Sequence, residues 1–290
     1  YKVMLMRYKS TRNSQLRLEA SQVIAQGISE EGGLFVPESF PDLSGELPAL
    51  AKLDYPALAK AIFSKFLTDF TEAEIEACVS RAYTPEKFGG PCPVKLVPLS
   101  GSSEEKLLLE LWHGPTCAFK DMALQILPHF LTTALRKAGG GKEAVILTAT
   151  SGDTGKAALE GFKDVPGTRI LVFYPRDGVS PMQKLQMVTQ EGGNVSVCAI
   201  QGNFDDAQTG VKTIFNRFSP TPSSRKSWKR MACCSPAPTP STGAGCCPRS
   251  STTSMPIWSL SGKGSASWAS PWTWWCPPGI SATFWRPTTP

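Results

Sequence analysis

Apolar and polar residues follow a regular rhythm in the middle of the chain, between residues 144 and 215. Short apolar runs typical of buried strands are each followed by a turn and then by a run with the helical period. The expected strands are Ala144–Thr150, Arg169–Tyr174 and Asn194–Ile200, and the expected helices are Lys156–Phe162, Pro181–Thr189 and Asp205–Phe215. Strands that alternate with helices predict βαβ units and a parallel sheet.

The residues before this region show a more mixed pattern. After Met6 we expect a short strand, a helix and another short strand, and Pro41–Leu53 is loop-like. Further on, the expected helices are Tyr55–Leu67, Thr71–Tyr83 and Lys120–Lys137, and the expected strands are Val94–Leu99 and Leu107–Trp112. We therefore divide this part into an N-terminal region of small elements, residues 1–93, and an α/β core, residues 94–216.

The periodic pattern ends after Asn216. Residues 217–290 keep neither the helical nor the strand period for any useful length. All 24 acidic residues of the chain lie at or before Asp206, whereas nine of its 30 basic residues and seven of its eight tryptophans lie after it. Ordinary composition would place about ten acidic residues in a segment of this length. We therefore expect this low-acid, Pro/Ser/Trp-rich tail to be disordered.

Composition narrows the classes of function. The basic residues of the tail are scattered, which argues against nucleic-acid binding. The chain has no apolar run long enough to span a membrane and no signal-peptide pattern, so we expect a cytoplasmic protein with no membrane partner. The only clustered cysteines are the adjacent pairs Cys233-Cys234 and Cys246-Cys247, and there are only two histidines, so we predict no metal site. The oligomeric state is not indicated.

Lys120 is the residue that we single out for chemistry. It follows an apolar run ending at Trp112 and the turn HGPT, and it stands beside Phe119 at the start of an expected helix. A lysine in a helix is most often a solvated surface cation. An aromatic neighbour and the positive end of a helix would instead lower its pKa and favour a nucleophilic amine. His113, in the turn, is either a packing residue or a general base.

A second candidate is the loop Ser151-Gly152-Asp153-Thr154-Gly155, which lies between an expected strand and an expected helix. Glycines allow a ligand to approach the backbone closely, and free N–H groups at a helix start attract a carboxylate or a phosphate. The alternative is an ordinary capped turn without a ligand.

Six stretches of the chain carry a family resemblance. They are STRN, EEGGLFVPESFP, HGPTCAFKDMALQ, ILTATSGDTGKAA, YPRDGVSPMQKLQMVTQEGGNV and QGNFDDAQ, in that order between Met6 and Asn216. Together they resemble threonine synthase, a family of fold-type II pyridoxal-phosphate enzymes. The resemblance implies an α/β fold with parallel sheets and flanking helices, which is incomplete in this chain.

The resemblance also implies a cofactor, a substrate and roles for residues. Lys120 would form a Schiff base with pyridoxal 5'-phosphate, with Phe119 and His113 near the cofactor. Ser151–Gly155 would face the carboxylate of O-phospho-L-homoserine, which the family converts with water to L-threonine and phosphate. The alternatives are another fold-type II enzyme, such as a threonine dehydratase or a cysteine synthase, and a non-catalytic homologue that binds ligands through the same loop.

The tail departs from the family, which has a glycine-rich loop, PTGNFGN, that cradles the cofactor phosphate. Codons can be chosen for PWTWWCPPGISATFWRPTT such that the frame one nucleotide earlier reads PVDVVVPTGNFGNILAAYY. We therefore hypothesise that the reading frame is lost near residues 216–220, and we expect the chain as written to be inactive.

Overall fold

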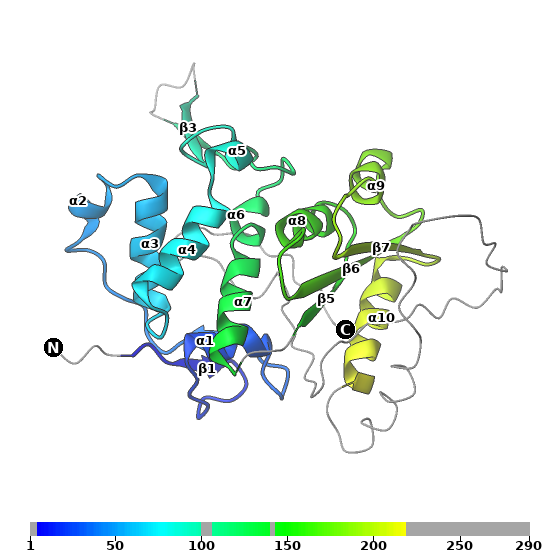
Figure 1. Ribbon diagram of the computed structural model, residues 1–290, viewed down its shortest axis with the longest axis horizontal. Helices are drawn as coiled ribbons and strands as arrows, with labels where there is room; N and C mark the ends of the chain where they lie inside the picture. Colours follow the sequence, from blue (N-terminus) through cyan, green and yellow to red (C-terminus); the bar gives the residue numbers. More distant parts are fainter. Residues whose placement is uncertain (1–4, 100–105, 140–142, 219–290) are drawn as a thin grey trace.

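The computed structural model describes residues 5–99, 106–139 and 143–218. In Figure 1 the helices α2, α3 and α4 lie on one side, and the sheet β5, β6 and β7 lies on the other. Helices α6 and α7 lie between the two sides. Predictions for the tail fall outside the described residues, apart from the last turn of α10 (Phe204–Phe218), which continues past the expected boundary at Asn216.

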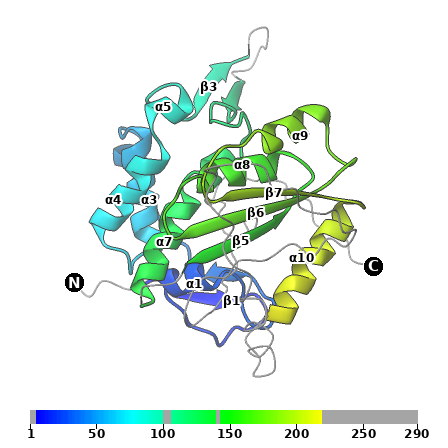
Figure 2. The ribbon, with the colours of Figure 1, turned by 45° about the vertical axis from the view of Figure 1, so that its right-hand side comes forward.

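The central sheet has the order β5-β6-β7 with parallel neighbours, as the alternating pattern predicted. Its strands are β5 (Ala144–Ala149), β6 (Thr168–Pro175) and β7 (Val195–Ile200). Helix α8 (Asp153–Phe162) follows β5, and α9 (Pro181–Val188) follows β6. Figure 2 shows α8 and α9 over one face of the sheet and α10 against the other.

The N-terminal part is built on two small motifs. β1 (Tyr8–Ser10) pairs antiparallel with β2 (Phe35–Pro37), and α1 (Ala20–Gln26) packs against α7 (Leu127–Lys137). Two capped helices follow, α3 (Tyr55–Phe66) and α4 (Glu72–Ala82). Thr71 caps α4 in a reciprocal pair with Glu74.

Three aromatic rings join α3 to α7 in the core. The Phe63 and Phe130 ring centroids lie 4.9 Å apart, and those of Phe70 and Phe130 lie 5.8 Å apart, both edge to face. This is the favoured arrangement of aromatic pairs, because the positive ring edge meets the negative ring face. The contact fixes α7, and with it the loop that carries Lys120, to the N-terminal helices.

Three predictions about single elements were wrong in detail. The expected helix Lys120–Lys137 is two helices, α6 (Asp121–Leu124) and α7, because Pro128 cannot donate the hydrogen bond that would continue α6. The expected loop Pro41–Leu53 contains a helical turn, α2 (Leu47–Leu50). The helix expected from Lys156 begins at Asp153 instead. The chain also forms a short helix that we did not predict, α5 (Pro85–Phe88).

The strands β3 (Lys95–Pro98) and β4 (Leu107–Glu110) form an antiparallel pair outside the central sheet. Leu96 is 63% exposed and Leu107 52% exposed, so this hairpin contributes little to the core. Within the described ranges, no helix is both long and apolar enough to cross a membrane.

Candidate active site at the carboxyl ends of the strands

The loops after β5, β6 and β7 each lead into the start of a helix. Because the three strands are parallel, these loops meet at one edge of the sheet, which is where α/β proteins usually bind ligands. The predicted loop Ser151–Gly155 comprises the end of the first of them and the first turn of α8. The structure therefore brings this loop to a position suited to a ligand.

Thr150 fixes the shape of that loop. Its hydroxyl oxygen accepts hydrogen bonds from the N–H groups of Gly152, at 3.1 Å, and Gly155, at 2.9 Å. The hydroxyl in turn donates to the Gly152 carbonyl at 3.0 Å. The Thr150 side chain thus closes a tight turn at the start of α8. The first N–H groups of any helix have no hydrogen-bond partner within that helix. Such a helix start favours an anion.

Gln183 joins this loop to the next one. Its amide nitrogen donates to the Asp153 carboxylate at 2.8 Å, and its amide oxygen accepts from Ser180 N–H at 3.2 Å. A Cβ atom on Gly152 would lie 2.6 Å from the Gln183 amide carbon, so a larger residue there would displace the Gln183 side chain. We did not predict this role, although the pattern Ser180-x-x-Gln183 is a sequence signal for a capping box.

Lys120 lies immediately before α6 and is partly buried. Burial lowers the pKa of its ammonium group, and the nearby negative charge of Asp153 partly opposes this shift. Its Nζ lies 5.1 Å from the centre of the Phe119 ring, which is 51% exposed. The structure therefore brings together Lys120, its predicted neighbour Phe119 and Asp153 of the Ser151–Gly155 loop.

The turn before Lys120 is held by a buried carboxylate. Asp121 is fully buried and accepts hydrogen bonds from the Thr116 N–H and hydroxyl groups, both at 2.8 Å. A Cβ atom on Gly114 would lie 2.8 Å from the Asp121 carboxyl carbon, so the turn packs closely on this side chain. Asp121 thus sets the path of the chain that leads to Lys120.

Replacing Asp121 by alanine is expected to destabilise the protein by about 1–3 kcal/mol, because two buried donors of Thr116 lose their acceptor. Asp121→Asn keeps one acceptor oxygen and should lose less. Urea unfolding of the three proteins measures the difference. Equal midpoints for wild type and Asp121→Ala would show that the turn does not depend on this carboxylate.

His113 has a partner that the sequence did not reveal. Its Nε2 lies 2.7 Å from a carboxylate oxygen of Glu110, and both side chains are largely buried. The Trp112 ring stacks on the imidazole with a centroid distance of 5.8 Å. Glu110 and His113 lie three positions apart outside a helix, so no helical periodicity in the sequence indicated that they form a pair. Glu110 fixes the orientation of the imidazole in this loop.

The described residues contain no group of three or more side chains suited to a metal ion. Asp205 and Asp206 lie in the first turn of α10, and Asp206 accepts a hydrogen bond from Asn203 N–H at 2.8 Å. Asp206 and Asn203 thus cap the start of α10.

Comparison with known proteins shows the family of the chain. The family profile described as threonine synthase N terminus matches residues 7–83. Threonine synthase from Pseudomonas aeruginosa is 38% identical over 212 residues, which is 72% of this chain and 44% of that protein. The chain belongs to the threonine synthase family. It spans less than half the length of this relative.

Solved structures of the family show the same fold. The PLP-bound threonine synthase from Brucella melitensis is 37% identical, with a TM-score of 0.66 over 73% of this chain and 44% of that one. The yeast threonine synthase is 33% identical, with a TM-score of 0.67 over 72% and 43%. The predicted fold class, an incomplete fold-type II α/β fold, is therefore confirmed.

Proposed function

We propose that this chain contains the part of a threonine synthase active site that includes the cofactor-binding lysine, Lys120. Completed by the rest of the family's catalytic domain, the site converts O-phospho-L-homoserine and water to L-threonine and phosphate. The observation that carries the proposal is the placement of Lys120, a partly buried amine with a lowered pKa, beside the start of α8. Membership of the threonine synthase family supports it.

The residues present fit the aldehyde end of pyridoxal 5'-phosphate. A partly desolvated amine is more often neutral, and the neutral amine is the form that attacks a carbonyl group. When bound, the cofactor supplies an electron sink for a carbanion at the substrate Cα. The part of the chain that the structure describes contains no counterpart of the PTGNFGN phosphate loop, so a second segment has to hold the phosphate end.

Each residue of the site then has a role. Lys120 would hold the cofactor and, once released as a free amine, would take up the proton from the substrate Cα, and Phe119 and His113 would line the cofactor. The backbone N–H groups of Ser151–Gly155 that do not donate to Thr150, which excludes those of Gly152 and Gly155, bind the substrate carboxylate. The Asp153 side chain is turned to Gln183, and a carboxylate would repel the substrate, so the anion contact is assigned to the backbone of this loop.

The protein as written is proposed to be inactive, and the protein encoded by the restored reading frame active. The test is phosphate release from O-phospho-L-homoserine by both proteins, together with sequencing of the DNA across residues 205–230. We expect turnover only with the restored frame. Turnover by the chain as written would contradict the proposal that this chain is inactive without the PTGNFGN loop. An intact reading frame in the DNA would refute the frameshift.

Replacing Asp153 by asparagine is expected to lower the pKa of Lys120 further, because the change removes the negative charge that stabilises the ammonium group. Asparagine keeps the oxygen that accepts from Gln183, so the loop stays in place. Borohydride trapping of the amine with pyridoxal phosphate should therefore reach half its maximum at a lower pH than in wild type. If the pH of half-maximal trapping were unchanged or higher, Asp153 would not act on Lys120.

Two wider assignments belong to the same proposal. The protein acts in the cytoplasm on a small-molecule substrate, without a nucleic-acid or membrane partner. The boundary near residue 93 separates the N-terminal region from the cofactor- and substrate-binding core, and β3 begins at Lys95, just after it.

A further inference from the structure

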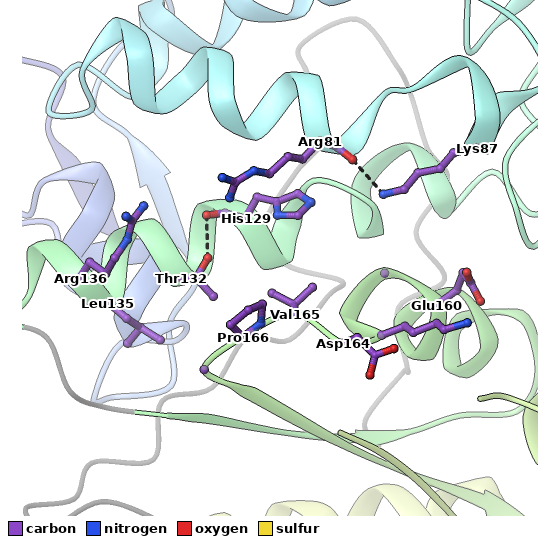
Figure 3. A pocket seen from close by; sticks show the side chains of 13 residues that line it. Arg81, Lys87, His129, Thr132, Leu135, Arg136, Glu160, Asp164, Val165 and Pro166 are labelled. Atoms are coloured by element: carbon purple, nitrogen blue, oxygen red, sulfur yellow. Dashed lines mark hydrogen bonds between the residues drawn. The ribbon is translucent and has the colours of Figure 1, made fainter. Parts of the chain in front are cut away.

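A cavity of about 750 Å³ lies between α4, α5, α7 and the segment that follows α8. Figure 3 shows Arg81 and His129 on one wall and Val165 and Pro166 on the opposite wall. Pockets of roughly 300–1,000 Å³ hold small organic ligands. None of the residues that we predicted for catalysis or substrate binding lines this cavity.

The cavity lies away from Lys120. Its lining includes Glu160 and Gly161, near the C-terminal end of α8, whereas Asp153, the neighbour of Lys120, begins that helix. Helices α6 and α8 are in close contact at Gly161, where an added Cβ would lie 2.9 Å from the Leu124 carbonyl carbon. The cavity and the proposed active site are thus at opposite ends of α8.

Four cations line the cavity, namely Arg81, Lys87, Arg136 and Lys163. Among the described residues, none of them forms an ion pair with a carboxylate. Lys87 Nζ donates to the Arg81 carbonyl at 2.9 Å, and Arg136 donates to the Thr133 hydroxyl at 3.1 Å. These partners are neutral, and the negative charge of Glu160 acts on Lys87 but is outweighed by burial, which lowers the pKa of this amine.

The two carboxylates in the lining, fewer than the four cations, also have partners outside it. Glu160 lies 3.5 Å from Lys156 Nζ and accepts from the Gln190 amide at 3.0 Å. Asp164 accepts from Gly193 N–H at 2.7 Å. The net charge of the lining is therefore positive. Like charges gathered in a concave, partly dry site repel one another strongly, and an anion relieves that repulsion.

The pKa of His129 is affected by the same positive charges of the cavity. Burial is the largest cause that lowers the pKa of its imidazole to about 4, and the charges of Lys87 and Arg81 add to the effect. The side chain is therefore neutral at pH 7 and can donate one hydrogen bond and accept another. An anion bound beside it would raise its pKa, which makes the residue a sensor of occupancy.

We propose that this cavity binds a small phosphorylated organic molecule. Its phosphate groups contact Arg81 and Arg136, whose guanidinium groups suit phosphate oxygens. Its apolar part packs against Leu135, Val165 and Pro166. A free phosphate alone would leave most of the volume unfilled.

The test is calorimetric titration of the full chain with ADP, pyrophosphate and adenosine at constant ionic strength. ADP is expected to bind more tightly than pyrophosphate, and adenosine not to bind. Arg81→Gln and Arg136→Gln should each weaken ADP binding by about tenfold. Arg17→Gln removes the same charge from an exposed N-terminal position and should leave binding unchanged. Circular dichroism confirms that each variant is folded.

A second readout is the pKa of His129, followed by NMR. The chain has only two histidines, so a His113→Asn variant assigns the signals. ADP should raise the pKa of His129. Equal weakening by Arg17→Gln, or a His129 pKa that ADP leaves unchanged, would overturn the proposal. Lys120→Ala should bind ADP normally, and loss of binding there would place the anion in the active site instead.

Discussion

Replacing Gly161 by alanine is expected to destabilise the protein by about 3 kcal/mol. A Cβ at this position would press on the backbone carbonyl group of Leu124 in α6, and backbone atoms cannot move aside as a flexible side chain can. Inserting a methyl group into a tight contact costs about 1–3 kcal/mol, and more where the neighbour is rigid. The change also separates α6, next to Lys120, from α8.

The matched control is Gly210→Ala in α10, where a Cβ meets nothing within 4 Å. In a helix with open space, alanine is expected to stabilise by about 0.5–1 kcal/mol because it restricts the unfolded chain. Urea unfolding of both variants therefore gives shifts of opposite sign. Shifts of the same sign would show that the contact between α6 and α8 is not as close as the structure has it.

Replacing Lys120 by alanine is expected to remove the imine that the protein forms with pyridoxal phosphate. In the protein with the restored reading frame, threonine formation should fall by roughly 10³-fold or more, since both the covalent attachment and the base are lost. Imine absorbance and a coupled phosphate assay measure the two effects.

The control for this variant is Lys87→Ala. Lys87 is also partly buried, and burial lowers the pKa of its amine as well, but it lies by the cavity at the other end of α8. This variant should keep the imine and the activity. Loss of the imine in Lys87→Ala but not in Lys120→Ala would show that Lys87, and not Lys120, holds the cofactor.

The elements that the sequence predicted best are those with a strong local signal. The strands and helices from β5 to α10 follow from short apolar runs and from starts such as Ser180-Pro181, where Ser180 caps α9 and Pro181 is its first residue. The break before α7 has a local cause too, in Pro128, but an apolar pattern that continues across it concealed the break. The antiparallel pairing of β3 and β4 depends on contacts that no periodicity records.

The site could be predicted only in part, for the same reason. Lys120 and the Ser151–Gly155 loop were recognised from motifs, and the structure places Asp153 of that loop near the amine. The bond between Gln183 and Asp153 joins residues 30 positions apart, which no local pattern encodes. Asp121 reads as an ordinary acidic residue in a first helical turn, and only its burial reveals that it holds the turn at Thr116.

The most direct test of the central claim is to trap the chain with pyridoxal phosphate and borohydride and to map the modified peptide. We expect the label on Lys120 at low reagent concentration, because this amine combines a lowered pKa with a position beside the start of α8. A label on Lys87, or one spread over the exposed lysines, would contradict the assignment of Lys120 as the residue that holds the cofactor.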